Sequence, residues 1–154
     1  MNKIPTILLA TAACFGCGFL CGMLQAGALG TWYPALDKSW VTPPDMALTI
    51  GWAISYICIG LSLGFVLEKD SEKRAFFIAL YAAQLFLQFL WILLFFHFRQ
   101  PAFGLAACGV LIALILWYKH KAKEVSLFAS RIYIPYLIWI IFTGYLNFYI
   151  VLKN

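Results

Sequence analysis

The side chains best suited to chemistry in this chain are its aromatic rings, which account for 18% of the 154 residues and include six tryptophans. Trp52, Trp91 and Trp139 each fall within a different long apolar segment. Indoles from separate segments suit the walls of a slot for a flat apolar molecule, because each aromatic pair contributes about 0.5–1.5 kcal/mol beyond burial. Trp52 and Trp139 are also our candidate catalytic residues, because indole rings can be oxidised.

Prolines and aromatic rings are concentrated in residues 32–56, which join the first apolar segment to the second. Connectors usually carry Gly, Ser, Asn and Asp, whereas here Pro43 and Pro44 fix two successive φ angles. We therefore predict that residues 30–44 form a rigid lid over a pocket between membrane helices, closed by Tyr33, Pro43 and Pro44. For Trp32 and Trp40 the simpler interpretation is anchorage at the membrane interface.

Amide side chains occur inside apolar segments, where they are costly against lipid tails and should face protein. Gln84, Gln88 and Asn147 are of this kind. They either form hydrogen bonds between helices or orient a ligand, and for Gln88, three residues before Trp91, we favour the second interpretation. Trp139, Thr143, Leu146 and Asn147 recur along one face of the last apolar segment at steps of three or four residues.

Other kinds of chemistry find little support in the sequence. Cys14, Cys17 and Cys21 share one helix face, but there is no second CxxC pair and no partnering His. We interpret them as small apolar residues and expect no metal site, no cofactor and no disulfide. We also find no nucleophile with a base and no carboxylate pair.

The rest of the sequence would place these side chains inside a membrane. It is 64% hydrophobic and 11% charged, whereas a typical soluble domain has about 25% charged residues. No Asp, Glu, Lys or Arg occurs in 4–36, 46–67, 75–98, 100–118 or 132–152, and about 20 apolar residues suffice to cross a bilayer. We predict an all-α membrane protein, a bundle of five transmembrane helices at roughly 5–29, 45–67, 75–97, 101–118 and 129–151.

The distribution of positive charge predicts the orientation. With five spans, eight of the eleven Lys and Arg residues fall on the side of the N-terminus, including those of a basic loop expected at 119–131. The positive-inside rule then places the N-terminus in the cytoplasm and the lid outside, most simply in a bacterial plasma membrane. The net charge of +5 indicates contact with the lipid bilayer and does not indicate binding to nucleic acid. Small residues recurring every fourth position from Ala10 to Gly30 fit either packing within the chain or a homodimer face.

Taken together, these motifs resemble the translocator protein family (TspO/MBR, also called tryptophan-rich sensory proteins), over nearly the whole chain. The first-loop signature stands as Trp32, Tyr33, Leu36, Lys38, Pro43 and Pro44, followed by Trp52 and Tyr56; the later ones as Gln84, Leu85, Trp91, Phe95 and Phe96, and as Pro135, Tyr136, Trp139, Leu146 and Asn147. Three positions depart from the family pattern: Ser39 for proline, Gln88 for asparagine, and Thr143 for a frequent alanine.

The resemblance implies a single domain over 1–154, usually dimeric, whose pocket under the first loop binds porphyrins such as protoporphyrin IX. Some members bind cholesterol or benzodiazepine-type ligands, and some bacterial members are implicated in light- and oxygen-dependent porphyrin breakdown. The expected ligand-binding residues are Trp32, Tyr33, Pro43, Pro44, Trp52, Tyr56, Gln88, Trp91, Trp139, Phe142, Thr143, Leu146 and Asn147, with Lys38 or Arg99 available to a ligand carboxylate. The alternative function is a passive transporter, or a sensor or scaffold for tetrapyrroles or sterols, without catalysis.

Overall fold

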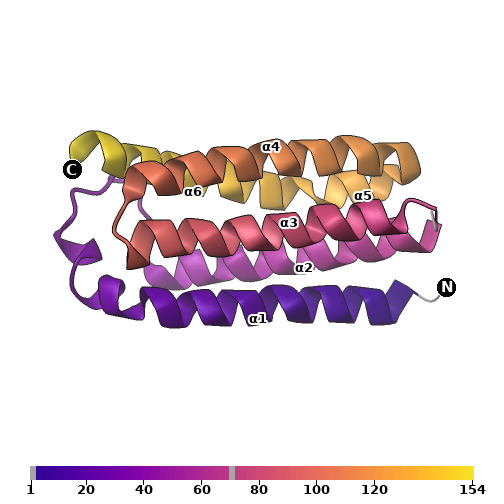
Figure 1. Ribbon diagram of the computed structural model, residues 1–154, viewed down its shortest axis with the longest axis horizontal. Coiled ribbons are helices and arrows are strands. Elements are labelled where there is room, and N and C mark those ends of the chain that lie inside the picture. Colours follow the sequence, from indigo (N-terminus) through magenta and orange to yellow (C-terminus); the bar gives the residue numbers. More distant parts are fainter. Residues whose placement is uncertain (1–2, 70–71) are drawn as a thin grey trace.

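The computed structural model describes residues 3–69 and 72–154, and the regular elements in these ranges are all helical (Figure 1). Five spans are long and apolar enough to cross a membrane: α1 (Lys3–Gly30), α2 (Asp45–Lys69), Arg74–His97, α4 (Pro101–Val125) and Leu127–Lys153. The third span contains α3 (Arg74–Ile92) and a π-helical turn, η2 (Leu93–His97); the fifth contains α5 (Leu127–Ile132) and α6 (Ile134–Lys153). The predicted all-α bundle of five membrane-spanning helices is confirmed.

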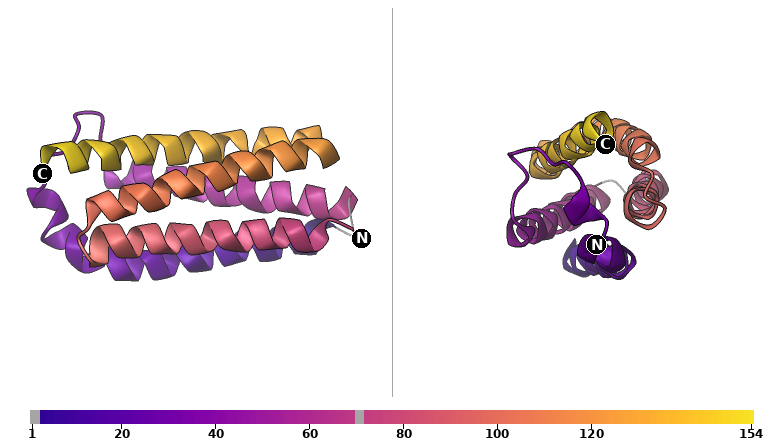
Figure 2. Two further views of the ribbon diagram at one scale, coloured as in Figure 1. Left: turned by 45° about the horizontal axis from the view of Figure 1, so that its top comes forward. Right: turned by 90° about the vertical axis from the view of Figure 1, so that its left-hand side faces the viewer.

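The spans pack side by side into a closed bundle, seen end-on in Figure 2. α1 packs against α2 and α3, α3 against α4, α4 against α6, and α6 against α2. The two ends of the chain lie at opposite ends of the bundle (Figure 1). The α1–α2 connection, which includes the short 3₁₀ helix η1 (Tyr33–Ala35), lies at the same end as the C-terminal residues. We call this end of the bundle the lid end.

The basic segment expected to be a loop is largely helical. α4 continues to Val125, and only Ser126 separates it from α5. Lys and Ala favour helix, so α4 continues past its apolar stretch. The Ser126 side chain then accepts a hydrogen bond from Ala129 N at 3.3 Å and caps the start of α5, as serine commonly does at this position.

The last span is broken near its proline. It was expected as one helix over 129–151, kinked at Pro135, but α5 ends at Ile132 and α6 begins at Ile134. Proline has no N–H, and its ring clashes with the carbonyl four residues earlier in a continuous helix. The break at Tyr133 removes this conflict by placing Pro135 in the first turn of α6, where proline is well tolerated.

Buried polar contacts fix the helices in the half of the bundle away from the lid. Ser62 Oγ lies 3.2 Å from the Tyr118 hydroxyl and donates to the Ala129 carbonyl at 2.9 Å. The Tyr118 ring stacks on Tyr133 at a centroid distance of 4.3 Å, and the Tyr133 hydroxyl donates to Gln84 Oε1 at 2.8 Å. Since hydrocarbon offers no hydrogen bonds, such groups must pair inside the protein, and these pairs join α2, α3, α4, α5 and the Tyr133 linker.

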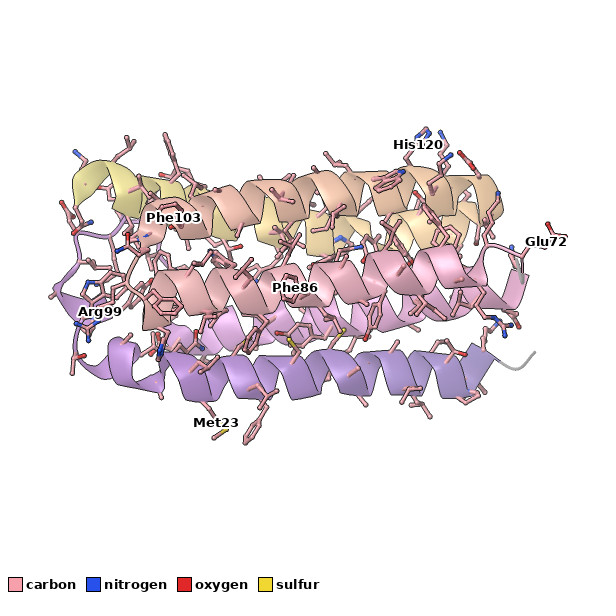
Figure 3. All side chains as sticks on the ribbon, viewed as in Figure 1. Met23, Glu72, Phe86, Arg99, Phe103 and His120 are labelled. Atoms are coloured by element: carbon pink, nitrogen blue, oxygen red, sulfur yellow. The ribbon has the colours of Figure 1, made fainter. Side chains whose placement is uncertain are left out.

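The outer surface of the bundle is apolar. Figure 3 shows Met23, Phe86 and Phe103 directed outward from the helices, whereas the labelled charged residues lie near the two ends of the bundle. Met23 is 64% exposed and Phe86 62%. A soluble helical bundle would turn such a surface inward, so this pattern is that of a protein surrounded by lipid.

Candidate ligand-binding site

A cavity of about 230 Å³ lies inside the lid end of the bundle, and we call it the inner cavity. Its walls come from α1, η1, α2, the third span and α6, and they are mostly apolar. The lining residues are Gln25, Leu29, Tyr33, Asp45, Leu48, Thr49, Trp52, Trp91, Ile92, Phe95, Phe96, Thr143, Leu146, Asn147 and Ile150.

Trp52 is the centre of a cluster of aromatic rings beside this cavity. Its ring lies 5.9 Å from Trp91, tilted by 37°, and 6.3 Å from Trp139 in an edge-on arrangement. Tyr56, one turn along α2, lies 5.8 Å from Trp52. The three indoles come from three different spans, as the sequence suggested. Only Trp52 and Trp91 line the inner cavity; Trp139 packs behind Trp52, against Gly51.

Aromatic contacts close the lid end. Trp32 packs against Phe95 at 5.7 Å between ring centroids, and Tyr33 packs against Phe96 at 5.5 Å. The Lys38 ammonium donates to the carbonyls of residues 33, 34 and 36 at 3.0–3.2 Å and lies 5.0 Å from the centre of the Tyr33 ring. Lys38 therefore braces the lid from within.

The C-terminal residue holds the next part of the lid. Asp37 N donates to Asn154 Oδ1 at 2.9 Å, and Asn154 Nδ2 donates back to the Asp37 carbonyl at 3.1 Å. Two residues later, Ser39 Oγ lies 3.3 Å from the Tyr145 hydroxyl of α6. The lid is thus tied at two successive points, to the residue that follows α6 and to Tyr145 of α6. We call the Asn154–Asp37 pair the lid latch.

A π-helical turn brings two neighbouring phenylalanines to the same site. Phe98 N donates to the Leu93 carbonyl at 3.0 Å, a five-residue spacing that widens the end of the third span. In an α-helix, neighbouring side chains point about 100° apart. In the wider turn, Phe95 and Phe96 both line the inner cavity and both contact Tyr33. The π turn therefore builds the wall on which the lid rests, in keeping with the frequent occurrence of such turns at functional sites.

The inner cavity carries a negative charge at one position. Among the described residues, Asp45 is the only ionised side chain that lines it, at the first position of α2. Burial raises the pKa of the nearby Tyr33 phenol, and the negative charge of Asp45 raises it further. Tyr33 therefore stays a neutral phenol at physiological pH. The lining offers no cation to a ligand carboxylate, at least among the residues that the structure describes.

A second cavity of about 470 Å³ adjoins the first, and we call it the outer cavity. Its walls come mainly from α1 and α2, with two residues of α3. The two cavities share Gln25, Thr49, Trp52 and Ile92. The remaining lining residues of the outer cavity are Phe15, Gly18, Phe19, Cys21, Gly22, Ala53, Tyr56 and Gln88. A single layer of shared side chains therefore separates two spaces that lie within one half of the bundle.

The structure brings most of the predicted site residues to these cavities. Tyr33, Trp52, Trp91, Thr143, Leu146 and Asn147 line the inner cavity, and Trp52, Tyr56 and Gln88 line the outer one. Five others line neither: Trp32, Pro43, Pro44, Trp139 and Phe142. Trp32 and Trp139 support wall residues through the ring contacts above, and Phe142 packs on Trp139 at 5.7 Å. Pro44 is exposed, and its carbonyl accepts from Ala47 N and Leu48 N at the start of α2.

The predicted polar contacts are used largely within the protein. Gln88 Nε2 donates to the Tyr136 hydroxyl at 2.5 Å, so the structure shows the interhelical alternative for its amide nitrogen. Thr143 donates within its own helix, to the carbonyl of Trp139 or Ile140. The Asn147 amide, oriented to satisfy both neighbours, accepts from Leu105 N at 2.8 Å and donates to the Pro101 carbonyl at 3.2 Å. Asn147 thereby fixes the start of α4 beside the inner cavity.

The cysteines lie in packed surroundings. Cys14 is fully buried with its sulfur 3.6 Å from the Tyr81 hydroxyl, and the Cys17 thiol points at the Leu85 carbonyl at 3.8 Å. All five cysteines are free thiols. Within residues 3–69 and 72–154, no group of three or more His, Cys, Asp or Glu side chains is placed to hold a metal ion.

Several lining residues were not singled out from the sequence. Gln25, Asp45 and Thr49 line the inner cavity as polar groups, and Gly18 and Gly22 of α1 line the outer one. The small-residue stripe of α1 was a usable signal, but it was interpreted only as a helix-packing face. The π turn that adds Phe95 and Phe96 has no comparable sequence signal.

Comparisons with known proteins agree with this architecture. The profile of the TspO/MBR family matches residues 10–152. A tryptophan-rich protein TspO from Archaeoglobus fulgidus is 33% identical over 99% of both chains. The translocator protein of Homo sapiens is 30% identical over 94% of this chain and 87% of its own length. A tryptophan-rich sensory protein from Cereibacter sphaeroides is 31% identical over 76% of this chain and 73% of its own.

Proposed function

The chain belongs to the TspO/MBR family and is a multi-pass membrane protein, and from that premise we propose that it binds porphyrins such as protoporphyrin IX. The ring would lie against Trp52 and Trp91, beneath the lid residue Tyr33. The observation that carries the proposal is the position of Trp52, which lines both cavities and contacts the two other indoles. A flat conjugated ring gains most from such aromatic walls.

The size of the site supports a ligand that extends through both cavities. Small-molecule sites usually measure about 300–1,000 Å³. The inner cavity, at about 230 Å³, is below that range alone, whereas the outer cavity adds about 470 Å³ directly beside it. A tetrapyrrole that reaches from one cavity to the other would pass Trp52 with its ring face or edge. Smaller flat molecules would fit the inner cavity alone.

The charge of the site indicates how a porphyrin would be oriented. Asp45 repels a carboxylate in the inner cavity, and Lys38 already donates to three lid carbonyls. We therefore infer that the propionates point out of the inner cavity and that the apolar ring edge enters first. The affinity comes from the ring in this arrangement, and the carboxylates stay near water or lipid headgroups.

We further propose that light and oxygen promote breakdown of the bound ring. The excited porphyrin takes one electron from the Trp52 indole, and dioxygen removes that electron from the reduced ring as superoxide, which forms beside its target. Trp139, edge-on to Trp52 at 6.3 Å, is placed to return an electron to it. Its Nε1 is buried and has no hydrogen-bond partner among the described residues, so the oxidised Trp139 ring would have no proton acceptor close by.

Substitution of the indoles tests both parts of this proposal. Trp52→Ala should weaken protoporphyrin IX binding by about tenfold, since an aromatic contact is worth about 0.5–1.5 kcal/mol beyond burial and tenfold in affinity corresponds to about 1.4 kcal/mol. Replacing Trp52 and Trp139 together by Phe should retain binding and slow the light-driven loss of porphyrin absorbance. Trp117→Phe is the matched control, because Trp117 lies on α4 and packs against Phe76, away from both cavities. Unchanged binding in Trp52→Ala contradicts the binding site, and an unchanged photolysis rate in the double variant contradicts the redox role.

The second candidate function is non-catalytic: passive passage of a flat apolar ligand, or a sensor or scaffold that responds to it. Coupled transport usually needs ionisable groups inside the membrane. Within the described residues the cavities offer only Asp45, at the lid end. Flux of protoporphyrin IX into proteoliposomes that does not respond to an ion gradient, without photolysis, would favour this alternative.

The distribution of Lys and Arg residues also suggests how the bundle is oriented in the membrane. We propose that the lid faces away from the cytoplasm and that the opposite end, where α2 and α4 end and α3 and α5 begin, faces inward, since most of the basic residues lie on that side. A small reactive tag placed after Gln100, at the lid end, should react with a membrane-impermeant reagent in intact cells. The same tag placed after Lys123 should react only after the cells are opened.

A further inference from the structure

We propose that the outer cavity is a side entrance through which a flat, uncharged ligand passes from the bilayer into the inner cavity. This inference rests on the proposed binding function and adds the route. The molecule that enters is an apolar ring compound already dissolved in the hydrocarbon. Three observations support it: several contacts hold the lid over the inner cavity, exposed rings of α1 line the outer cavity, and the two cavities share lining residues.

The route through the lid is obstructed by several independent contacts. The lid latch ties Asp37 to Asn154, Lys38 holds three carbonyls, and the rings of Trp32 and Tyr33 rest on Phe95 and Phe96. Opening this end would break polar contacts and aromatic packing together. A ligand that is sparingly soluble in water also spends most of its time in the membrane, so an entrance on the lid side serves it poorly.

The outer cavity opens along the α1–α2 seam, at membrane depth. It is lined by Phe15 and Phe19 of α1, which are 44% and 71% exposed. On a helix long and apolar enough to cross the membrane, that exposure is to lipid. The seam is open at Gly22, where a β-carbon would meet no atom within 4 Å, whereas the Tyr56 ring packs directly against Gly18 one turn earlier.

The inner end of the entrance is formed by the residues common to both cavities. Gln25 of α1, together with Thr49 and Trp52 of α2, lines each space. Passage between the cavities therefore depends on these side chains and not on residues of the lid. Gln25 and Thr49 also give a ligand heteroatom its first polar contacts after it leaves the hydrocarbon.

The test compares an obstructed seam with a loosened lid. Gly22→Phe places a ring in the outer cavity. Gly16→Phe is the control: a β-carbon at Gly16 also meets no atom within 4 Å, but Gly16 lines neither cavity. Asn154→Ala removes the lid latch. The probe is protoporphyrin IX dimethyl ester, which is uncharged, in phosphatidylcholine vesicles holding the full chain. Quenching of tryptophan fluorescence after rapid mixing gives association and dissociation rates.

We expect Gly22→Phe to slow association by about tenfold or more relative to Gly16→Phe, and Asn154→Ala to leave the association rate within about twofold of the unsubstituted protein. Equal association rates in the two phenylalanine variants overturn the side entrance. Faster dissociation alone in Gly22→Phe also overturns it, because the outer cavity is then only part of the binding site. Faster association in Asn154→Ala points to entry through the lid.

Two further results would have a different meaning from the comparison of the variants. If association slows as the protein-to-lipid ratio rises, a second copy of the chain covers the seam and the entrance is not open to lipid. If the unsubstituted protein binds neither the dimethyl ester nor protoporphyrin IX, the proposed function fails together with the route. Binding with rates that Gly22→Phe does not change contradicts the route alone.

Discussion

The ring of Trp139 occupies the space that a β-carbon on Gly51 would fill. A carbon built at that position overlaps three atoms of the indole, so the absence of a side chain on α2 is what lets α6 bring Trp139 behind Trp52. We predict that Gly51→Ala displaces the Trp139 ring and lowers the thermal stability of the purified protein in detergent. The cost should be about 1–3 kcal/mol, typical of overpacking, despite the better helix propensity of alanine.

The matched control for this prediction is Gly109→Ala on α4, where an added β-carbon meets no atom within 4 Å. It should be neutral or slightly stabilising, because alanine favours helix by up to about 1 kcal/mol. Equal stability of Gly51→Ala and Gly109→Ala would show that the Trp139 ring is not held where the structure places it.

Neutralising Asp45 should change which porphyrins bind best. Asp45→Asn removes the negative charge from the inner cavity, and we expect it to strengthen binding of the dicarboxylate protoporphyrin IX by about two- to fivefold at low salt. Affinity for the uncharged dimethyl ester should not change. Direct titration of both ligands into the two proteins measures the effect. An equal gain for ester and acid would point to altered packing in place of charge.

The same substitution should also shift the titration of Tyr33. Asp45 is the second cause, after burial, that raises the pKa of this phenol. Removing a neighbouring negative charge favours the phenolate, so the pKa of Tyr33 should fall in Asp45→Asn while staying above its ordinary value. The difference in phenolate absorbance between proteins with and without Tyr33→Phe isolates this group, and an unchanged pKa would contradict the predicted interaction.

The Gln84–Tyr133 pair should behave as a coupled unit. The Tyr133 hydroxyl donates to Gln84 Oε1 at 2.8 Å, and Gln84 Nε2 is buried without a partner among the described residues. Tyr133→Phe should destabilise the protein by about 1–2 kcal/mol, because it leaves the amide unsatisfied. Adding Gln84→Leu should recover part of the loss, since both polar groups are then gone. Additive losses in thermal unfolding of the single and double variants would contradict the coupling.

Phe95 should be necessary for an ordered lid. It is 3% exposed and contacts both Trp32 and Tyr33. Phe95→Ala should expose residues 30–44 to proteolysis at a rate well above that of the unsubstituted protein, because the lid loses its support. Phe98→Ala removes an exposed ring from the same end of the bundle and serves as control. Equal cleavage rates in the two variants would show that the lid is held by its polar contacts alone.

The sequence predicted the number and type of spans because charge-free windows of membrane length are a strong physical signal. It also indicated that Trp52, Trp91 and Trp139 come from three different spans, the second, third and fifth, and could face one pocket. It did not predict the π turn or the position of Trp139 behind Trp52. These depend on local crowding at Gly51 and on hydrogen bonds between residues five apart, neither of which leaves a pattern in residue type.

For Gln88 the sequence left two alternatives, and it could not tell them apart because both require an amide facing protein. Its amide nitrogen donates to the Tyr136 hydroxyl, 48 residues away, while the side chain also lines the outer cavity. The basic segment 119–131 was interpreted from charge alone, which sets position relative to the membrane but not backbone conformation. Its helical residues and the Ser126 cap were visible in the sequence and could have corrected the expectation of a loop.

The buried hydrogen bonds and the ring stacking that link Ser62, Tyr118, Tyr133 and Gln84 lie in one half of the molecule, whereas both cavities lie in the other. The half with these contacts should therefore be rigid, and the half with the cavities should be more flexible. Thermal motion should be concentrated in the half with the cavities. Ligands of different size could then bind there without disturbing the packing of the other half. Amide hydrogen exchange should accordingly be slowest around residue 62 of α2 and fastest near its first turn.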